Sequence, residues 1–169
     1  VFGVILGTGV GAGVVVNGQA LSGLHAIAGE WGHNPLPWPR DDERPGTTCY
    51  CGKPGCIETW LSGPGIAANF GDGKTPTAEI VKRAEAGDAL AEAYMQRVED
   101  RLARAFATSI NILDPDVIVL GGGVSNIARL YANVPKLLPK YVFSEFVETR
   151  IAQNVHGDSS GVRGAAWLW

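Results

Sequence analysis

The sequence has 169 residues, of which 46% are hydrophobic and 18% charged, and this composition is typical of a folded domain rather than a disordered chain. The formal net charge is −3 and lysines and arginines form no cluster, so no nucleic-acid partner is expected for this segment. No apolar stretch approaches the roughly 20 residues that span a bilayer, and the first residues lack signal-peptide features, so we expect a cytoplasmic protein without membrane contact.

Apolar runs and turn residues divide the first third of the sequence. Asn17-Gly18 is a strong hairpin signal directly after a run of three valines. Residues 22–56 are rich in glycine and proline and have no periodic apolar face, which predicts a long ordered loop. The elements expected before this loop are a strand at 1–6, a glycine turn at 7–11, a strand at 12–17 and a short strand at 19–21.

Helical periodicity marks the remainder of the sequence. Apolar residues recur every three or four positions over 88–114, which predicts a long core-facing helix that Asp114-Pro115 ends. A buried strand at 116–120 then leads through glycines into another helix, an order typical of nucleotide-binding α/β folds. The other elements expected are helices at 58–70, 76–86, 127–138 and 161–169, and a strand at 147–152.

The three cysteines of the sequence, Cys49, Cys51 and Cys56, lie within eight residues. A disulfide would leave one thiol unpaired and would be unusual in a protein without a secretion signal. Glycine and proline bend this stretch sharply, so that three thiolates can point at one metal ion. The spacing therefore predicts a zinc site, although cysteines that bind no metal remain the alternative.

The fourth zinc ligand must come from outside the cysteine stretch. The sequence offers His25, His33 and His156, and we select His33 because it lies between two loop-forming segments ahead of the cysteines. Three thiolates and one imidazole complete a closed tetrahedral site. Such a site predicts a structural zinc ion rather than one that activates water.

The glycine-rich stretch at 7–13 predicts a turn whose backbone N–H groups approach a phosphate, with the Thr8 hydroxyl as a further donor. The valines at 14–16 continue as a strand, which excludes the dinucleotide-binding motif because that motif requires a helix there. Residues 73–75 resemble the end of a P-loop, but Ala68 stands where that motif needs its first glycine. A hairpin turn without a ligand remains the alternative for 7–13.

Polar side chains near the cysteines suggest a third site. Glu30, His33 and, beyond the cysteines, Glu58 can accept or donate hydrogen bonds to vicinal hydroxyls in a fixed direction. On its own this signal is weak, because a glutamate beside a tryptophan is more often a solvated surface residue.

Four motifs extend over nearly the whole sequence. They read Leu6-Gly7-Thr8-Gly9-Val10-Gly11-Ala12-Gly13, Ala28-Gly29-Glu30-Trp31-Gly32-His33, Cys49-x-Cys51-Gly-x-x-Gly-Cys56-x-Glu58, and Asp114-Pro115-Asp116 leading to Gly121-Gly122-Gly123. Together they resemble the ROK family of bacterial sugar kinases and sugar-responsive repressors. Residues 30–38 and the long spacer before the cysteines look most like the bacterial ROK fructokinases, also called mannokinases, with N-acetylglucosamine kinases second.

The resemblance implies an α/β fold of the actin-like ATPase (ribonuclease H-like) class with a zinc-binding loop insertion. Two lobes of this fold close over ATP and sugar, and the family commonly forms homodimers. Residues 1–169 would be the C-terminal lobe, with the zinc-binding loop at 29–58. The N-terminal lobe is expected upstream of Val1 or on another chain.

The resemblance also assigns roles residue by residue. The zinc ligands would be His33, Cys49, Cys51 and Cys56, and the second ring nitrogen of His33 would contact the sugar. Glu30 and Glu58 would hydrogen-bond sugar hydroxyls. The nucleotide contacts would be Gly7, Thr8 and Gly9 at the phosphates and Gly121, Gly122 and Gly123 at the adenosine.

The activity implied is ATP- and Mg²⁺-dependent phosphorylation of a hexose, with fructose at its 6-hydroxyl as the first expectation. The general-base aspartate of the family belongs to a motif that does not occur in these residues, so no catalytic residue is assigned and the isolated chain is expected not to turn over. The alternatives are an N-acetylglucosamine or glucose kinase, or the sugar-sensing part of a ROK repressor. A stand-alone zinc-ribbon-like module is remote, because it needs a second ligand pair and a cluster of basic residues, and the sequence has neither.

Overall fold

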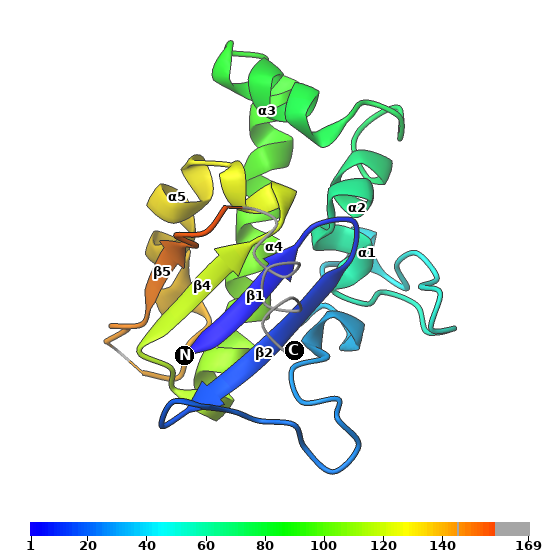
Figure 1. Cartoon of the computed structure of the whole chain (residues 1–169). Coiled ribbons are helices and arrows are strands. Elements are labelled where there is room, and N and C mark those ends of the chain that lie inside the picture. Colours follow the sequence, from blue (N-terminus) through cyan, green and yellow to red (C-terminus); the bar gives the residue numbers. More distant parts are fainter. Residues whose placement is uncertain (145, 158–169) are drawn as a thin grey trace.

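A computed structural model describes residues 1–144 and 146–157. Its centre is a five-stranded mixed sheet in the order β3-β2-β1-β4-β5 (Figure 1). β1 pairs antiparallel with β2 and parallel with β4, and β4 pairs parallel with β5. The strands are β1 Phe2–Leu6, β2 Val10–Val16, β3 Gln19–Ala20, β4 Val117–Gly121 and β5 Arg150–Gln153. The α/β class expected from the sequence is confirmed.

The longest helix, α4, crosses behind the sheet in Figure 1. α1 and α2 lie beyond β2, α5 lies beside β5, and α3 lies toward the end of the sheet where β1 and β4 terminate (Figure 1). The α-helices are α1 Glu58–Leu61, α2 Gly63–Ala68, α3 Thr77–Glu85, α4 Ala89–Leu113 and α5 Arg129–Leu137. Short 3-10 turns occur at Trp31–His33, Asp41–Glu43, Gly123–Asn126 and Leu138–Lys140. No helix in the described ranges is both long enough and apolar enough to cross a membrane.

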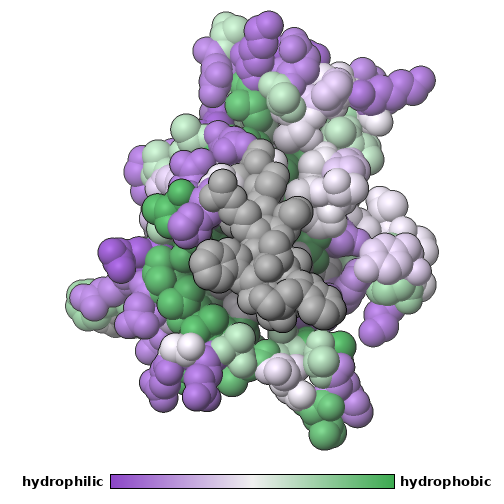
Figure 2. Space-filling model, in the orientation of Figure 1, coloured by the Kyte–Doolittle hydropathy of each residue, from purple (hydrophilic) through white to green (hydrophobic). Residues whose placement is uncertain are grey.

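The hydrophobic core lies between the sheet and α4. In β1 the alternating residues Phe2, Val4 and Leu6 are buried, as strand periodicity requires for a sheet packed on one face. Full burial of one such side chain contributes about 1.5 to 3 kcal/mol. Ile5 points to the other face and is 41% exposed. Figure 2 shows hydrophobic side chains beside the strands on that face and hydrophilic side chains gathered over α3.

α4 has well-defined ends. The Asp88 side chain caps its start by accepting two backbone hydrogen bonds from the first turn. At its end Asp114 adopts a left-handed conformation with φ of 42°, and Pro115 cannot continue the helix. The predicted limits of 88–114 are therefore confirmed to within a residue at each end.

The single helix expected at 58–70 is wrong, because the chain breaks it at Ser62. The Ser62 hydroxyl accepts a hydrogen bond from Gly65 N at 3.0 Å and so caps a new helix, α2, with Pro64 in its first turn. The break also frees Gly63 N to donate to Gly7 O at 2.8 Å. This contact joins the helix pair to the turn that follows β1.

Smaller differences concern the C-terminal third. The helix expected at 127–138 begins at Arg129, because residues 123–126 form a tight 3-10 turn after β4. The strand expected at 147–152 is observed as β5, over 150–153. The helix expected at 161–169 lies outside the described residues.

A buried ionic cluster attaches the long loop to α4, and the sequence did not predict it. Glu43, which is 2% exposed, accepts from Arg101 Nε at 2.8 Å and from Arg104 at 3.0 Å. Arg104 also donates to the carbonyl oxygens of Pro37 and Trp38. We call Glu43, Arg101 and Arg104 the Glu43 cluster.

The Glu43 cluster keeps its carboxylate ionised. Burial by itself raises the pKa of Glu43, but hydrogen bonds from the Arg40 backbone and Arg101, with the positive charge of Arg104, outweigh it. The pKa falls from 4.5 to about 2 as a result. The loop is thus held to the helix by a charge that stays paired at neutral pH.

Candidate functional site

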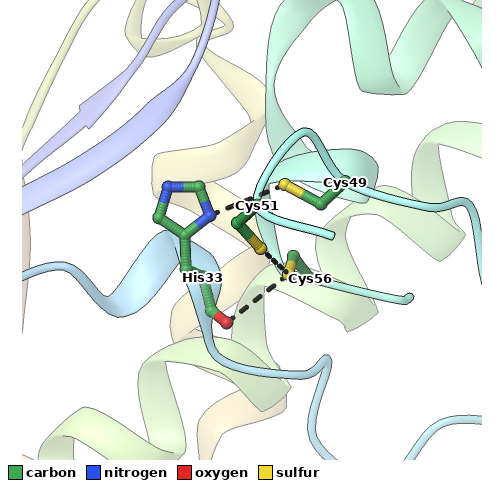
Figure 3. Close-up of side chains that lie close together, drawn as sticks. All are labelled: His33, Cys49, Cys51 and Cys56. Carbon is green, nitrogen blue, oxygen red and sulfur yellow. Dashed lines mark hydrogen bonds between the residues drawn. The ribbon is translucent and has the colours of Figure 1, made fainter. Parts of the chain in front are cut away.

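The structure brings His33, Cys49, Cys51 and Cys56 together, and their candidate ligand atoms all lie within 4.8 Å of one another. Figure 3 shows the imidazole and the three thiols pointing toward a common centre. Cys49 Sγ lies 3.6 Å from His33 Nδ1, and Cys51 Sγ lies 3.6 Å from Cys56 Sγ. A tetrahedral zinc ion with Zn–S bonds of about 2.3 Å places its ligand atoms about 3.7 Å apart. The spacing suits such an ion.

Backbone turns hold the three thiols in place. Gly52 has a φ of 85°, a conformation that side-chain-bearing residues rarely adopt, and it turns the chain between Cys51 and Cys56. Cys49 N donates to Lys53 O at 2.9 Å and closes this turn. An antiparallel bridge between Pro35 and Cys56 then brings the last thiol beside the segment that carries the histidine. The cysteine spacing and the bridge together build the cluster.

The histidine of the cluster is positioned by its neighbours in the chain. Trp31 is buried and its ring stacks on that of Phe106, with the centroids 5.6 Å apart, so this tryptophan is a core anchor. At Gly32 a Cβ would clash with the carbonyl oxygen of Val10, so only glycine permits this close approach to β2. The segment is thereby fixed between the core and the sheet.

The thiols differ in their affinity for protons. A hydrogen bond from the Lys53 backbone lowers the pKa of Cys51 to about 7. Burial raises the pKa of Cys56 well above its ordinary value, and its hydrogen bond with Cys51 acts in the same direction. Metal ligation requires thiolates, so a metal ion that binds here displaces protons, including the one that burial holds on Cys56.

Glu58, the first residue of α1, connects the cluster to the turn between β1 and β2. Its Oε2 accepts from Val10 N at 2.8 Å, and its Oε1 lies 3.8 Å from Cys49 Sγ. At Gly9 a Cβ would lie 2.7 Å from the same carboxylate, so a glycine at this position leaves room for the Glu58 side chain. The carboxylate is half-buried and keeps one oxygen free of backbone contacts.

Tyr50 lies beside His33 of the cluster and was not predicted as a site residue. Its hydroxyl is 2.9 Å from His33 Nε2, the ring nitrogen that faces away from the cysteines. Desolvation raises the pKa of Tyr50, and the negative charges of Glu58, Cys49 and Glu30 add to it. Of the predicted sugar-binding residues, His33 contacts this tyrosine and Glu58 contacts the neighbouring Cys49, whereas Glu30 lines a separate hollow beside Trp31 and Asn34. The position of Tyr50 between Cys49 and Cys51, two of the predicted zinc ligands, was the only signal in the sequence that could have pointed to it.

A second site lies where β1 and β4 end. A pocket of about 610 Å³ opens there, and ligands of open α/β sheets bind at the carboxyl ends of parallel strands. It is lined by Gly7 and Thr8 after β1, by Gly63 and Pro64 of α2, by Thr77, Ala78, Val81 and Glu85 of α3, and by Gly123, Val124, Asn126, Ile127 and Ala128 after β4. Its volume is within the range of small-molecule sites.

Only some of the predicted nucleotide contacts line this pocket. Gly7, Thr8 and Gly123 do, whereas Gly9 lies against Glu58. Gly121 ends β4 and is buried. Gly122 has a φ of 79°, and a Cβ on it would lie 2.5 Å from Leu6 O, so it shapes the turn rather than lining the pocket.

The contribution of α3 to this pocket was not predicted. Thr75-Pro76 predicts the start of this helix, but that four of its residues line the pocket follows only from the tertiary structure. A larger hollow of about 940 Å³ lies at the opposite end of β4, beside Pro115 and Asp116. It contains none of the glycine turns or cluster residues, so we assign no site to it.

Comparison with known proteins identifies the family of this chain. The ROK family profile matches residues 1–169. The chain is 44% identical to an N-acetyl-D-glucosamine kinase of Aliivibrio salmonicida and 40% identical to one of Yersinia enterocolitica. Each match covers 99% of this chain and 58% of the relative, so the chain spans about three-fifths of their length. These relatives do not support the fructokinase subgroup expected from residues 30–38.

Solved structures show the same fold. The chain matches a ROK hexokinase of Thermus thermophilus with a TM-score of 0.81 and 28% identity, over 98% of this chain and 55% of that one. It matches a ROK glucokinase of Streptomyces griseus with a TM-score of 0.82 and 23% identity, over 99% of this chain and 59% of that one. The actin-like ATPase fold expected from the sequence is thus the fold of these proteins. On this evidence the chain belongs to the ROK family.

Proposed function

We propose that this chain supplies the sugar-, metal- and nucleotide-binding part of an ATP-dependent sugar kinase. One observation carries the proposal, namely that the polar cluster and the strand-end pocket meet at a single turn. Gly7 and Thr8 of this turn line the pocket, while Val10 N of the same turn is bound by Glu58. A phosphate in the pocket and a hydroxyl at the cluster would therefore be held by one rigid segment, as phosphoryl transfer requires.

N-acetyl-D-glucosamine is the proposed substrate, in place of the fructose expected from the loop. Support comes from two relatives named as N-acetyl-D-glucosamine kinases, with 44% and 40% identity. Glu30 and His33, with the oxygen of Glu58 that lies away from Val10, are the proposed contacts for sugar hydroxyls. Carboxylates and a neutral imidazole provide both acceptors and a donor for such hydroxyls.

Zinc is the proposed metal of the four-residue cluster, with His33 Nδ1 and the three thiols as its ligands. The donor set fits, because three sulfurs and one nitrogen at these spacings suit a closed tetrahedral site. The ion would be structural and would fix the ring of His33. Metal analysis of the purified protein should find about one zinc per chain.

ATP with Mg²⁺ is the proposed ligand of the 610 Å³ pocket. Backbone N–H groups of the glycine turn and the Thr8 hydroxyl would meet its phosphates, and the turn at Gly122 and Gly123 would lie near its adenosine. Four expectations stay predictions. They are a catalytic aspartate outside this sequence, no turnover by the 169-residue chain alone, the role of the chain as a C-terminal lobe, and a homodimeric state.

A sugar-sensing regulator is the second candidate. The chain matches a ROK family transcriptional regulator with a TM-score of 0.72 and 27% identity, over 90% of this chain and 41% of that one. The intact pocket at the strand ends favours the kinase, because a pure sensor has no need of ATP.

Calorimetric titration distinguishes these functions. The zinc-loaded protein would be titrated with a non-hydrolysable ATP analogue and Mg²⁺, and then with N-acetylglucosamine, glucose or fructose. A kinase should bind the nucleotide, and N-acetylglucosamine should bind most tightly of the three sugars. Sugar binding without nucleotide binding would favour the regulator, and tighter fructose binding would restore the original substrate expectation.

A further inference from the structure

Tyr50 is the residue of the sugar-binding region that no role yet explains. It is 84% exposed, so its ring is not part of the core. Its ring meets that of His33 edge to face, with the centroids 5.0 Å apart and the planes at 89°. Its hydroxyl is 2.9 Å from His33 Nε2. An exposed aromatic side chain is thus held by one histidine.

The two nitrogens of His33 have separate tasks. Nδ1 lies 3.6 Å from Cys49 Sγ, and a metal ion in the cluster would occupy its lone pair. The neutral imidazole then carries its proton on Nε2, which donates to the hydroxyl of Tyr50. A metal-bound histidine generally needs such an acceptor to fix its ring.

The same Nε2–H is the donor proposed above for a sugar hydroxyl. One N–H group makes one good hydrogen bond, so the tyrosine and the sugar compete for it. Displacement of Tyr50 exposes little new surface, because the ring already lies mostly in water. A bound sugar hydroxyl would replace the phenol as acceptor without leaving His33 unpaired.

We propose that Tyr50 is a gating residue of the sugar site, whose hydroxyl accepts from His33 Nε2 until a sugar hydroxyl displaces it. The proposal rests on the proposed function, because it assumes that a sugar reaches His33. The Nε2–H group of His33 is the donor for which the phenol and the sugar hydroxyl compete.

The substitution Tyr50→Phe separates the two roles, because it keeps the ring and removes only the acceptor. Sugar binding should become tighter by about two- to tenfold, the value of one hydrogen bond no longer broken. Without sugar, the variant should lose zinc to a chelator up to about tenfold faster, because His33 lacks its acceptor. Sugar should restore zinc retention, since binding at the two sites is reciprocally linked.

The test uses zinc-loaded wild-type and Tyr50→Phe proteins with N-acetylglucosamine as the probe. Calorimetry with the ATP analogue present gives sugar affinity, and release to a colorimetric chelator gives zinc retention with and without sugar. Lys53→Gln is the matched control, because Lys53 is an exposed side chain of the same turn and its backbone provides the turn's hydrogen bonds. The control should match the wild type in both measurements.

Weaker sugar binding by Tyr50→Phe would overturn the proposal, because the hydroxyl would then contact the sugar directly. Unchanged sugar affinity together with unchanged zinc release in Tyr50→Phe would also overturn the gating proposal. In that case the proposed function would still stand, because the wild type binds sugar. Absence of sugar binding by every protein tested, the wild type included, would contradict the proposed function and this inference with it.

Discussion

The cysteine loop and the strand-end pocket are built by different means. The loop places side chains: a histidine and three cysteines converge, and their thiols and imidazole define the site. The pocket is defined by backbone turns, because glycine turns follow β1 and β4. The side chains around it come from α3 and from the residues after β4. A side-chain site tolerates little change of residue type, whereas a backbone site tolerates side-chain changes and fails when its turns are strained.

The largest effect should come from the metal ligand Cys56, which is almost fully buried. We expect Cys56→Ser to lose zinc and to cost more than about 4 kcal/mol of unfolding free energy, as loss of a structural metal does. The midpoint of thermal unfolding should fall by roughly 10 °C. Scanning calorimetry and metal analysis measure both, and chelator-treated wild type is the control. Full zinc content in the variant would contradict the assignment.

The second effect should come from the Glu43 cluster, which fixes the loop to α4. Glu43→Gln leaves Arg101 buried without its counter-charge and removes one of the two carboxylates that pair with Arg104, the other being Asp100, so we expect a loss of about 3 to 5 kcal/mol in urea unfolding. Asp42→Asn is the matched control, because Asp42 forms an exposed ion pair with Arg97 and should cost less than about 1 kcal/mol. Equal losses in the two variants would show that the loop does not depend on this cluster.

The pH dependence of stability should report the same carboxylate. The folded pKa of Glu43, about 2, is lower than its ordinary value of 4.5, so its stabilisation is present above pH 4.5 and is lost as the pH falls toward 2. The pKa shift corresponds to about 3 kcal/mol. Urea unfolding of the wild type and Glu43→Gln across this range should converge at low pH. A constant difference between them would assign the effect to another group.

The smallest effect should separate two neighbouring glycines of the pocket turn. Gly122→Ala forces a left-handed residue and places its Cβ against Leu6 O, so we expect a loss of about 2 kcal/mol and weaker nucleotide binding. Gly123→Ala meets no heavy atom within 4 Å and should change stability by less than about 0.5 kcal/mol. Thermal unfolding with and without the ATP analogue compares them. Similar behaviour of the two variants would contradict a pocket shaped by backbone.

Much of the fold followed from local patterns. Asn17-Gly18 predicted the hairpin, and the periodicity of 88–114 predicted α4, because each signal lies within one element. The break at Ser62 was not predicted although its signal is local, because a serine whose hydroxyl caps Gly65 N, followed by Pro64 in the first turn, is typical of a new helix start.

The sequence by itself determined the family, the α/β class and the four residues of the cysteine cluster, since ligand types at short spacing and glycines at turns are local properties. Only the tertiary structure decided which side chains meet across long separations. Tyr50 on His33, Glu43 under α4 and the face of α3 toward the pocket depend on packing between distant segments. No local pattern encodes such contacts, because burial and hydrogen-bond competition select them when the whole chain folds.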